Sequence, residues 1–252
     1  MKQQNDSPAV WQGNELVRSY LQNIRAGIPY GVDQIAMALR VASSLRSDVS
    51  SVLDLGCGDG IVGFSARQIW PGARLTLVDF SMPMLDAARV RFAGEQGVAF
   101  IDVDFGAPHW IEHIADRAPF DLVVSAYAIH HQEDDRKRTL YHEISELLAP
   151  GGVFINIEHV QSATPALEAV WNRLLVETLI AQHPERNPAQ VEREFAVRPD
   201  RFANRLAPLE TQLDWLRDAG LLDVDCYFKI LELAVFGGRK PNDEDAQPAP
   251  ST

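Results

Sequence analysis

Three glycines at every second position, Gly56, Gly58 and Gly60, follow an apolar stretch that contains Asp54. Because glycine has no Cβ, a ligand can approach such a loop closely, and amide groups at the start of the next helix can face its polar groups. A second apolar stretch ends on Asp79, roughly 20 residues after the last of these glycines, a spacing at which a carboxylate reaches ribose hydroxyls. The pattern predicts a site for a nucleoside-containing cofactor.

The glycine loop also matches the G-x-G-x-x-G pattern of dinucleotide-binding folds, over residues 58–63. Three features argue against a dinucleotide. Asp54 would face a cationic amino group better than a pyrophosphate, and the sequence has no Tyr-x-x-x-Lys pair. Phe80 and Met84, which follow Asp79, form an apolar edge suited to a single adenine.

Residues 54–60, Asp-Leu-Gly-Cys-Gly-Asp-Gly, and residues 77–85, Leu-Val-Asp-Phe-Ser-Met-Pro-Met-Leu, resemble the first and second motifs of the class I S-adenosylmethionine-dependent methyltransferases. The resemblance covers roughly residues 50–160 and 208–239, and it is nearest to small-molecule enzymes such as the ubiquinone-biosynthesis and trans-aconitate methyltransferases. It implies S-adenosylmethionine (SAM) as the cofactor and methyl transfer as the activity.

The resemblance also implies which residues hold the cofactor. Asp54 and the glycine loop would bind the methionine end, and Asp79 would bind both ribose hydroxyls. Asp104, or alternatively Asp102, would contact the amino edge of the adenine. The implied set is Asp54, Gly56, Cys57, Gly58, Gly60, Asp79, Phe80, Met84, Asp104, Phe105, Ser125 and Ala126, together with Tyr20 and Arg25 from the N-terminal segment.

Candidate catalytic residues follow the fourth and fifth predicted strands, at the sheet edge where ligands bind in such folds. A histidine there, His130 or His131, could accept a proton from an oxygen, nitrogen or sulfur nucleophile, because its pKa lies near working pH. The alternative, that the ring binds backbone and shapes the pocket, is favoured for His130, and the two alternatives are balanced for His131. Glu158 could bind a substrate amine, act as a base or tether the following segment. With Tyr127, these residues form the candidate catalytic set.

Composition limits the function classes. Among 252 residues, 35 are acidic and 23 are Lys or Arg, and the formal net charge of −12 disfavours nucleic acid as a partner. No apolar run reaches the length of about 18 residues that a membrane span needs. The N-terminus lacks the apolar core of a secretion signal, and two cysteines make a disulfide framework implausible, so we expect a cytoplasmic protein without membrane partners. A metal centre of His130, His131 and His159 has no support from ligand spacing, so no metal is expected.

Alternating apolar strands and amphipathic helices predict an α/β fold, a Rossmann-like, open, mostly parallel seven-stranded sheet with an antiparallel last strand. The expected strands are 52–55, 74–79, 98–101, 120–126, 153–157, 222–228 and 229–236. The expected segments are an N-terminal helical lid (1–45), a SAM-binding core (46–160), a helical cap insertion (161–207), a closing helix and hairpin (208–240) and a disordered tail (241–252).

Two of these segments have possible contacts beyond the core. In the lid, Tyr20 and Arg25 would close over the cofactor, and plain packing of amphipathic helices is an equal alternative. In the cap, the apolar helix expected at 165–181 could pack against a second copy, so the sequence permits a homo-oligomer.

The sequence therefore predicts a SAM-dependent methyltransferase that acts on a small molecule through a nitrogen, oxygen, sulfur or carbon acceptor. Two alternatives stay open. A non-catalytic SAM-binding regulatory module would keep the glycine loop beside a filled acceptor pocket. A nicotinamide-dependent oxidoreductase would bind NAD in place of SAM.

Overall fold

A seven-stranded sheet forms the centre of the computed structural model, which describes residues 8–24, 27–243 and 245. The strand order is β3-β2-β1-β4-β5-β7-β6, and β7 runs antiparallel to both of its neighbours while β1 to β5 pair in parallel. The strands are β1 (Ser51–Leu55), β2 (Arg74–Asp79), β3 (Val98–Asp102), β4 (Phe120–Ala126), β5 (Leu148–His159), β6 (Leu222–Ile230) and β7 (Leu233–Arg239). The predicted fold class is confirmed.

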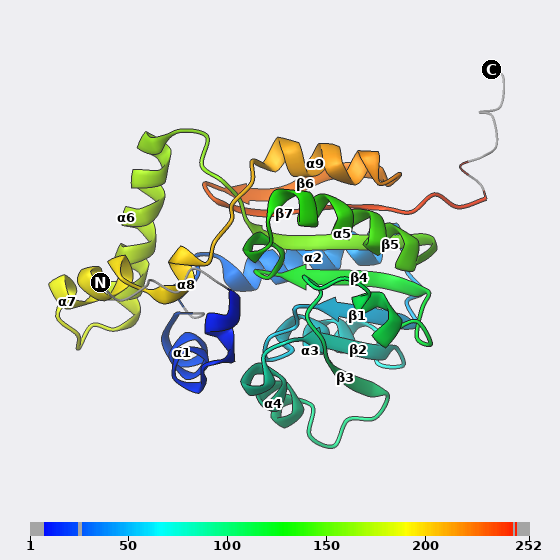
Figure 1. The fold of residues 1–252 in the computed structure, drawn as a ribbon, viewed down its shortest axis with the longest axis horizontal. Helices are drawn as coiled ribbons and strands as arrows, with labels where there is room; N and C mark the ends of the chain where they lie inside the picture. The colour runs from blue at the N-terminus through cyan, green and yellow to red at the C-terminus, as the bar shows by residue number, and fades with distance from the viewer. Residues whose placement is uncertain (1–7, 25–26, 244, 246–252) are drawn as a thin grey trace.

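Helices cover both faces of the sheet (Figure 1). Buried side chains of α2, α3 and α4 pack on one face, and those of α5 and α9 pack on the other. The helices are α1 (Asn14–Ser19), α2 (Gly31–Leu45), α3 (Ile61–Ile69), α4 (Met82–Arg91), α5 (Asp134–Leu147), α6 (Pro165–Gln182), α7 (Pro188–Ala196), α8 (Pro199–Phe202) and α9 (Leu209–Asp218). Short helical turns are η1 (Pro8–Gln12), η2 (Tyr20–Ile24), η4 (Trp110–His113) and η5 (Ile129–His131). None of the described helices is long and apolar enough to cross a bilayer.

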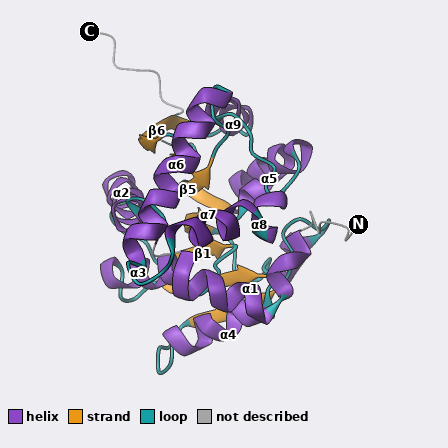
Figure 2. Cartoon of the chain, turned by 90° about the vertical axis from the view of Figure 1, so that its left-hand side faces the viewer, coloured by secondary structure: helices purple, strands orange, loops and turns teal. Residues whose placement is uncertain are grey.

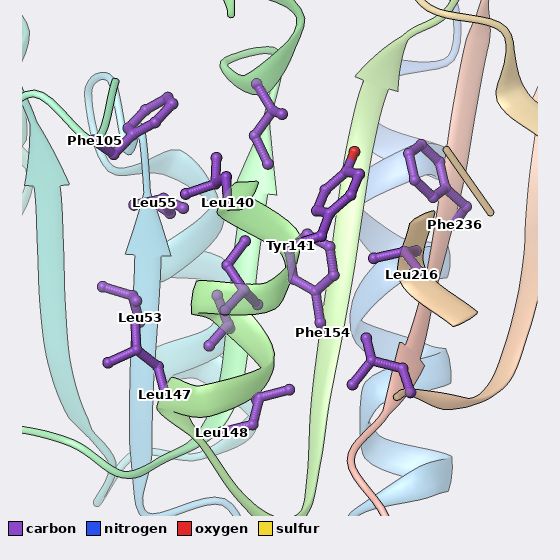
Figure 3. Packing of buried hydrophobic residues seen from close by; sticks show 14 of the residues in the cluster. Leu53, Leu55, Phe105, Leu140, Tyr141, Leu147, Leu148, Phe154, Leu216 and Phe236 are labelled. Carbon is purple, nitrogen blue, oxygen red and sulfur yellow. The ribbon is translucent and has the colours of Figure 1, made fainter. Parts of the chain in front are cut away.

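The core between the sheet and helices α5 and α9 is built from large apolar side chains (Figure 3). Phe154 of β5 and Tyr141 of α5 are fully buried, with ring centroids 5.8 Å apart. The Tyr141 hydroxyl donates to Oε1 of Gln212 at 2.7 Å, which satisfies the polar end of the ring. Because helices cover both faces, the central strands read as continuous apolar runs. The sheet is thus packed between helices on both faces, and its carboxyl edge positions the loops that follow the strands.

The closing hairpin turns later than predicted. β6 runs on to Ile230 and β7 begins only at Leu233, so the predicted boundary between them, at 228–229, is wrong. Neither predicted strand contains a glycine, proline or asparagine that would mark a turn. The turn forms instead at Leu231, with a φ of 50°, and at Glu232, whose side chain is held by contacts from β5 and the segment after it.

Helix α1 and helices α6 to α8 gather at one end of the sheet (Figures 1 and 2). The segment with α6 to α8 lies between β5 and α9 in the chain, as an excursion from the core. Of the tail predicted to be disordered, residues 241–243 and 245 are described, and Asp245 forms an ion pair with Arg239 at 2.5 Å. The remainder of that tail and residues 1–7 lie outside the described part of the chain.

Asp121, at the start of β4, ties this strand to the connection between α2 and β1. Its Oδ2 accepts the backbone N–H of Ser50 at 2.8 Å and the Ser50 hydroxyl at 2.7 Å, and its Oδ1 lies 2.5 Å from the Arg46 guanidinium. Burial opposes ionisation, but the hydrogen bonds from Ser50 and the charge of Arg46 hold the pKa of Asp121 below its usual value. A lowered pKa means that the carboxylate contributes stability above about pH 4 and that this contribution is lost as the pH falls.

We expect Asp121→Asn to lower the free energy of unfolding at pH 7 by about 1 kcal/mol, because asparagine keeps one acceptor oxygen but loses the charge. Urea denaturation at pH 7 and in acid measures this. The difference in the free energy of unfolding between wild type and variant should narrow as the pH falls below about 4, and it should vanish only where Asp121 of the folded wild type becomes protonated, because its pKa is lowered. The matched control is Asp116→Asn, at an exposed aspartate. An equal loss in both variants would show a general charge effect and contradict the prediction.

Candidate active site

A cavity of about 360 Å³ lies at the carboxyl edge of the sheet. Loops that follow β1 to β4 form its inner side, and the N-terminal segment and residues of α6 to α8 form its outer side. The predicted site residues that line it are Tyr20, Gly56, Gly58, Asp79, Phe80, Met84, Phe105, Ala126, Tyr127, His130 and His131. The fold thus brings candidate cofactor-binding and catalytic residues to one cavity.

The loop after β1 reaches the cavity through glycine. Gly56 has a φ of 67°, and a Cβ there would lie 2.3 Å from the Cβ of Ala128, so a side chain at this position would clash. Gly58 has a φ of 53°, and a Cβ there would have Met84 Sδ, at 3.8 Å, as its one neighbour within 4 Å. The missing side chain at Gly58 leaves open space beside the loop, which a ligand could fill.

Asp79 connects the loops after β1 and β2. Its Oδ2 accepts the backbone N–H of Gly58 at 2.8 Å, and its Oδ1 accepts that of Ser81 at 2.8 Å. Burial raises the pKa of Asp79 to about 6, although these hydrogen bonds act in the opposite direction. The carboxylate is therefore mostly ionised at pH 7. Each oxygen also keeps a second lone pair that a hydroxyl donor could use.

Some predicted cofactor-binding residues do not line the cavity. Asp54 is buried beneath the glycine loop, where its Oδ2 accepts the backbone N–H of Gly63 at 2.8 Å and its Oδ1 has no hydrogen-bond partner among the described residues. Burial raises the pKa of Asp54 to about 8. Its carboxyl group contacts the first turns of α3 and not the cavity. The other residues away from the lining are Cys57, Gly60, Asp104 and Ser125. Arg25 lies outside the described residues.

The N-terminal segment covers the cavity through Trp11, which no motif in the sequence marks. Its carbonyl oxygen accepts the Ser81 hydroxyl at 2.5 Å, and its ring packs edge-on against Tyr20 with centroids 5.0 Å apart. Its indole Nε1 donates to Nε2 of His131 at 3.1 Å. Trp11 therefore joins the loops after β2 and β4.

His131 has both ring nitrogens engaged. Because Nε2 accepts from Trp11, the proton sits on Nδ1, which donates to the carbonyl oxygen of Ala203 at 3.2 Å. Burial lowers the pKa of His131 to about 3, so the ring is neutral at physiological pH. The residue links the N-terminal segment to the turn after α8, and neither nitrogen is left for a substrate proton.

His130 and Glu158 form a buried pair. His130 Nδ1 lies 2.5 Å from Glu158 Oε1, which also accepts the backbone N–H of His159 at 2.7 Å. Glu158 Oε2 accepts from the Asn156 amide at 3.4 Å. Because the Glu158 carboxylate accepts hydrogen bonds from all three groups, the proton of His130 lies on Nδ1. The other ring nitrogen, Nε2, then keeps a lone pair. This Nε2 has no hydrogen-bond partner within the described part of the chain.

Burial sets the protonation of this pair. It lowers the pKa of His130, so the imidazole is neutral, and it raises the pKa of Glu158 to about 7. A neutral imidazole with an unengaged Nε2 can accept a proton, and a neighbouring carboxylate stabilises the imidazolium that results. The geometry therefore favours the base role for His130, although the sequence favoured a structural role for this residue.

Tyr127 contributes to the wall of the cavity. Its hydroxyl donates to Oε1 of the buried Gln34 at 2.8 Å, and its backbone has a φ of 52°. Burial raises the pKa of Tyr127, so the phenol keeps its proton at neutral pH. Glu158, by contrast, does not line the cavity and reaches it through His130.

Much of the outer wall comes from the excursion at 161–207, where the sequence offers no motif. Its lining residues are Glu168, Trp171, Asn172, Leu175, Phe195, Arg198, Asp200, Arg201, Asn204 and Leu206. The sequence of this segment shows only apolar periodicity. That pattern predicts a core position for Trp171 as readily as a position in the cavity wall. His159 and Glu232 also line the cavity. Within the described residues, no group of three or more His, Cys, Asp or Glu side chains is placed to hold a metal ion.

Comparisons with known proteins agree with this geometry. Residues 52–152, which include the glycine loop and Asp79, match the family model described as a methyltransferase domain. The chain is 31% identical over 156 residues to the ribosomal RNA large subunit methyltransferase G of Shewanella amazonensis, a match that covers 58% of this chain and 38% of that protein. The chain thus spans well under half the length of this curated relative.

Two solved structures show the same fold. The N-methyltransferase NodS from Bradyrhizobium japonicum, in complex with S-adenosylhomocysteine, superposes with a TM-score of 0.59 at 18% identity, covering 92% of this chain and 99% of that one. Human N-acetylserotonin methyltransferase, in complex with SAM, gives a TM-score of 0.59 at 19% identity, covering 93% of this chain and 58% of that one. Residues 52–152, with the glycine loop and the strands around it, are thus similar in sequence to a methyltransferase domain, and the chain shares its fold with S-adenosylmethionine-dependent methyltransferases.

Proposed function

We propose that the protein transfers a methyl group from SAM to an oxygen or nitrogen atom of a small molecule, with His130 as the general base. The observation that carries this proposal is the His130–Glu158 pair. It holds an unengaged imidazole Nε2 in the same cavity as Gly58 and Asp79. A methyltransferase needs a proton-accepting group beside its cofactor site, whereas a SAM-binding regulatory module does not need one.

The residues around the inner half of the cavity fit SAM. The open space at Gly58 suits close approach of the methionine end, and Asp79 has lone pairs left for the ribose hydroxyls. Phe80 and Met84 provide apolar surface for the adenine. When bound, SAM supplies a methyl group already activated by a sulfonium, so the protein has to align the acceptor, exclude water and take up a proton.

The proton balance assigns the role of His130. A hydroxyl or amine acceptor loses its proton as its bond to the methyl carbon forms and the carbon–sulfur bond breaks. His130 Nε2 accepts this proton, and the Glu158 carboxylate stabilises the imidazolium through Nδ1. The products are the methylated acceptor, S-adenosylhomocysteine and one proton, which His130 returns to water.

A small acceptor is favoured over nucleic acid by charge and by the shape of the site. The formal net charge of −12 opposes binding to a phosphate backbone. Trp11 and Trp171 both line a cavity of about 360 Å³, a volume within the range for small-molecule sites.

Calorimetric titration with SAM, S-adenosylhomocysteine and NAD tests the proposal. We expect dissociation constants near 1 μM for SAM and S-adenosylhomocysteine, about −8 kcal/mol, and no response to NAD. Methyl transfer to a panel of small phenols, alcohols and amines should follow. Binding of NAD alone would overturn the cofactor assignment. SAM binding without methyl transfer to any member of the panel would instead favour the regulatory module.

A further inference from the structure

His159 and Glu232 form a second imidazole–carboxylate pair beside the first. His159 Nε2 lies 2.6 Å from Glu232 Oε2, and Glu232 Oε1 accepts the Ser162 hydroxyl at 2.5 Å. Glu232 is buried, with 3% of its surface exposed. His159 ends β5 and Glu232 lies in the turn between β6 and β7, so the pairing of β5 with β7 brings them together. Neither residue takes part in the proton transfer described above.

The two pairs present the same chemistry to the cavity. Because the Glu232 carboxylate accepts hydrogen bonds, the proton of His159 sits on Nε2 and its lone pair on Nδ1. Nδ1 has no hydrogen-bond partner among the described residues and is not among their fully buried polar atoms. The ring centroids of His130 and His159 are 5.7 Å apart, and both residues line the cavity. One small ring could therefore reach both imidazoles.

We propose that His159, held by Glu232, binds a second hydrogen-bond donor of the acceptor, and that the acceptor is an aromatic compound with two adjacent hydroxyl or amino groups. This inference rests on the proposed function. Two imidazole lone pairs require two donors, and a ligand with a single donor would leave one nitrogen without a partner. The Trp171 ring, whose centroid is 5.8 Å from that of His159, adds an apolar surface suited to an aromatic ring.

The two donors would have different fates. The group at His130 loses its proton and gains the methyl group, whereas the group at His159 keeps its proton and sets the orientation of the ring. After transfer, the methylated oxygen no longer donates, so the product makes one hydrogen bond fewer than the acceptor did. His159 is thus expected to contribute to acceptor affinity and to discrimination against the product.

Titration of the S-adenosylhomocysteine complex with catechol, phenol and 2-methoxyphenol tests this inference. We expect catechol to bind about tenfold more tightly than phenol, as one additional hydrogen bond would give, and 2-methoxyphenol to resemble phenol. His159→Gln should abolish the preference for catechol while leaving phenol binding unchanged. The amide N–H of glutamine can still donate to Glu232, but glutamine provides no lone pair at the position of Nδ1.

Two further variants make the result specific. His159→Phe, which keeps a ring beside Trp171, should lose the same preference, and it replaces His159→Gln if that variant does not fold. His109→Gln, at an exposed histidine away from the cavity, is the matched control and should behave as wild type.

The outcomes separate the two proposals. Equal affinity for catechol and phenol, no measurable binding of catechol, or an unchanged preference in the His159 variants would overturn this inference, and the proposed function would stand if S-adenosylhomocysteine binds. If S-adenosylhomocysteine does not bind, the proposed function fails and this inference fails with it.

Discussion

Replacing His130 by asparagine is expected to lower kcat for methyl transfer by about 10²–10⁴-fold, the range for loss of a general base. The asparagine amide can still donate to Glu158, as His130 Nδ1 does at 2.5 Å, but it has no nitrogen at the position of Nε2. The variant therefore removes the base and retains the buried hydrogen bond. The affinity for SAM, measured by calorimetry, should stay near that of the wild type.

His131→Ala is the matched comparison for this prediction. Both ring nitrogens of His131 are engaged by Trp11 and Ala203, so its removal should affect the packing of the N-terminal segment more than the chemical step. We expect a much smaller loss of kcat than in His130→Asn. Equal turnover in His130→Asn and wild type, or a larger loss in His131→Ala, would contradict the assignment of the base.

The His130–Glu158 pair also predicts a pH dependence. Burial raises the pKa of Glu158 to about 7, and below this pH the carboxyl group holds a proton and no longer accepts the Nδ1–H of His130. The imidazole then loses the tautomer that leaves Nε2 able to accept a proton. We therefore expect kcat to rise with pH through about 7 and to level off above it. Glu158→Gln, which cannot titrate, should lose this step, and a step that persists in the variant would argue against Glu158 as its source.

Asp79→Ala should weaken SAM binding by at least tenfold, about 1.4 kcal/mol, because the ribose hydroxyls would lose the carboxylate that accepts their hydrogen bonds. The loss has a second source. Asp79 also accepts hydrogen bonds from the backbone N–H groups of Gly58 and Ser81, so the alanine variant loosens the two loops that border the cofactor site. Calorimetric titration with SAM measures the effect, and thermal unfolding of the unliganded variant separates loop loosening from ribose binding.

The control for Asp79 is Asp116→Ala. Asp116 is exposed and does not line the cavity, so its removal should leave SAM affinity unchanged. The pH dependence has a definite sign: as the pH falls through about 6, Asp79 takes up a proton and loses acceptor capacity, so wild-type affinity for SAM should decrease. Unchanged affinity in Asp79→Ala would remove the ribose assignment.

The sequence alone determined the sheet and the proximity of the glycine loop to Asp79. Strand and helix alternation is a local pattern, and residues that follow parallel strands meet at one edge whatever the details of packing. The glycine loop and Asp79 could therefore be placed beside each other from the sequence, and the cavity contains both. The backbone at Gly56 lies so close to Ala128 that only glycine fits there, and this glycine can be recognised in the sequence. The hairpin boundary was misplaced because no turn residue marks it.

The tertiary structure decided the chemistry of the imidazole groups that line the cavity. His130 meets Glu158 from 28 positions away, His159 meets Glu232 from 73, and Trp11 meets His131 from 120. Such pairs depend on strand register and on the burial that sets each tautomer and pKa, and neither leaves a local signature in the sequence. For the same reason the sequence could not rank His130 above His131. The partner of each imidazole makes that distinction, and only the folded chain shows which partner each one has.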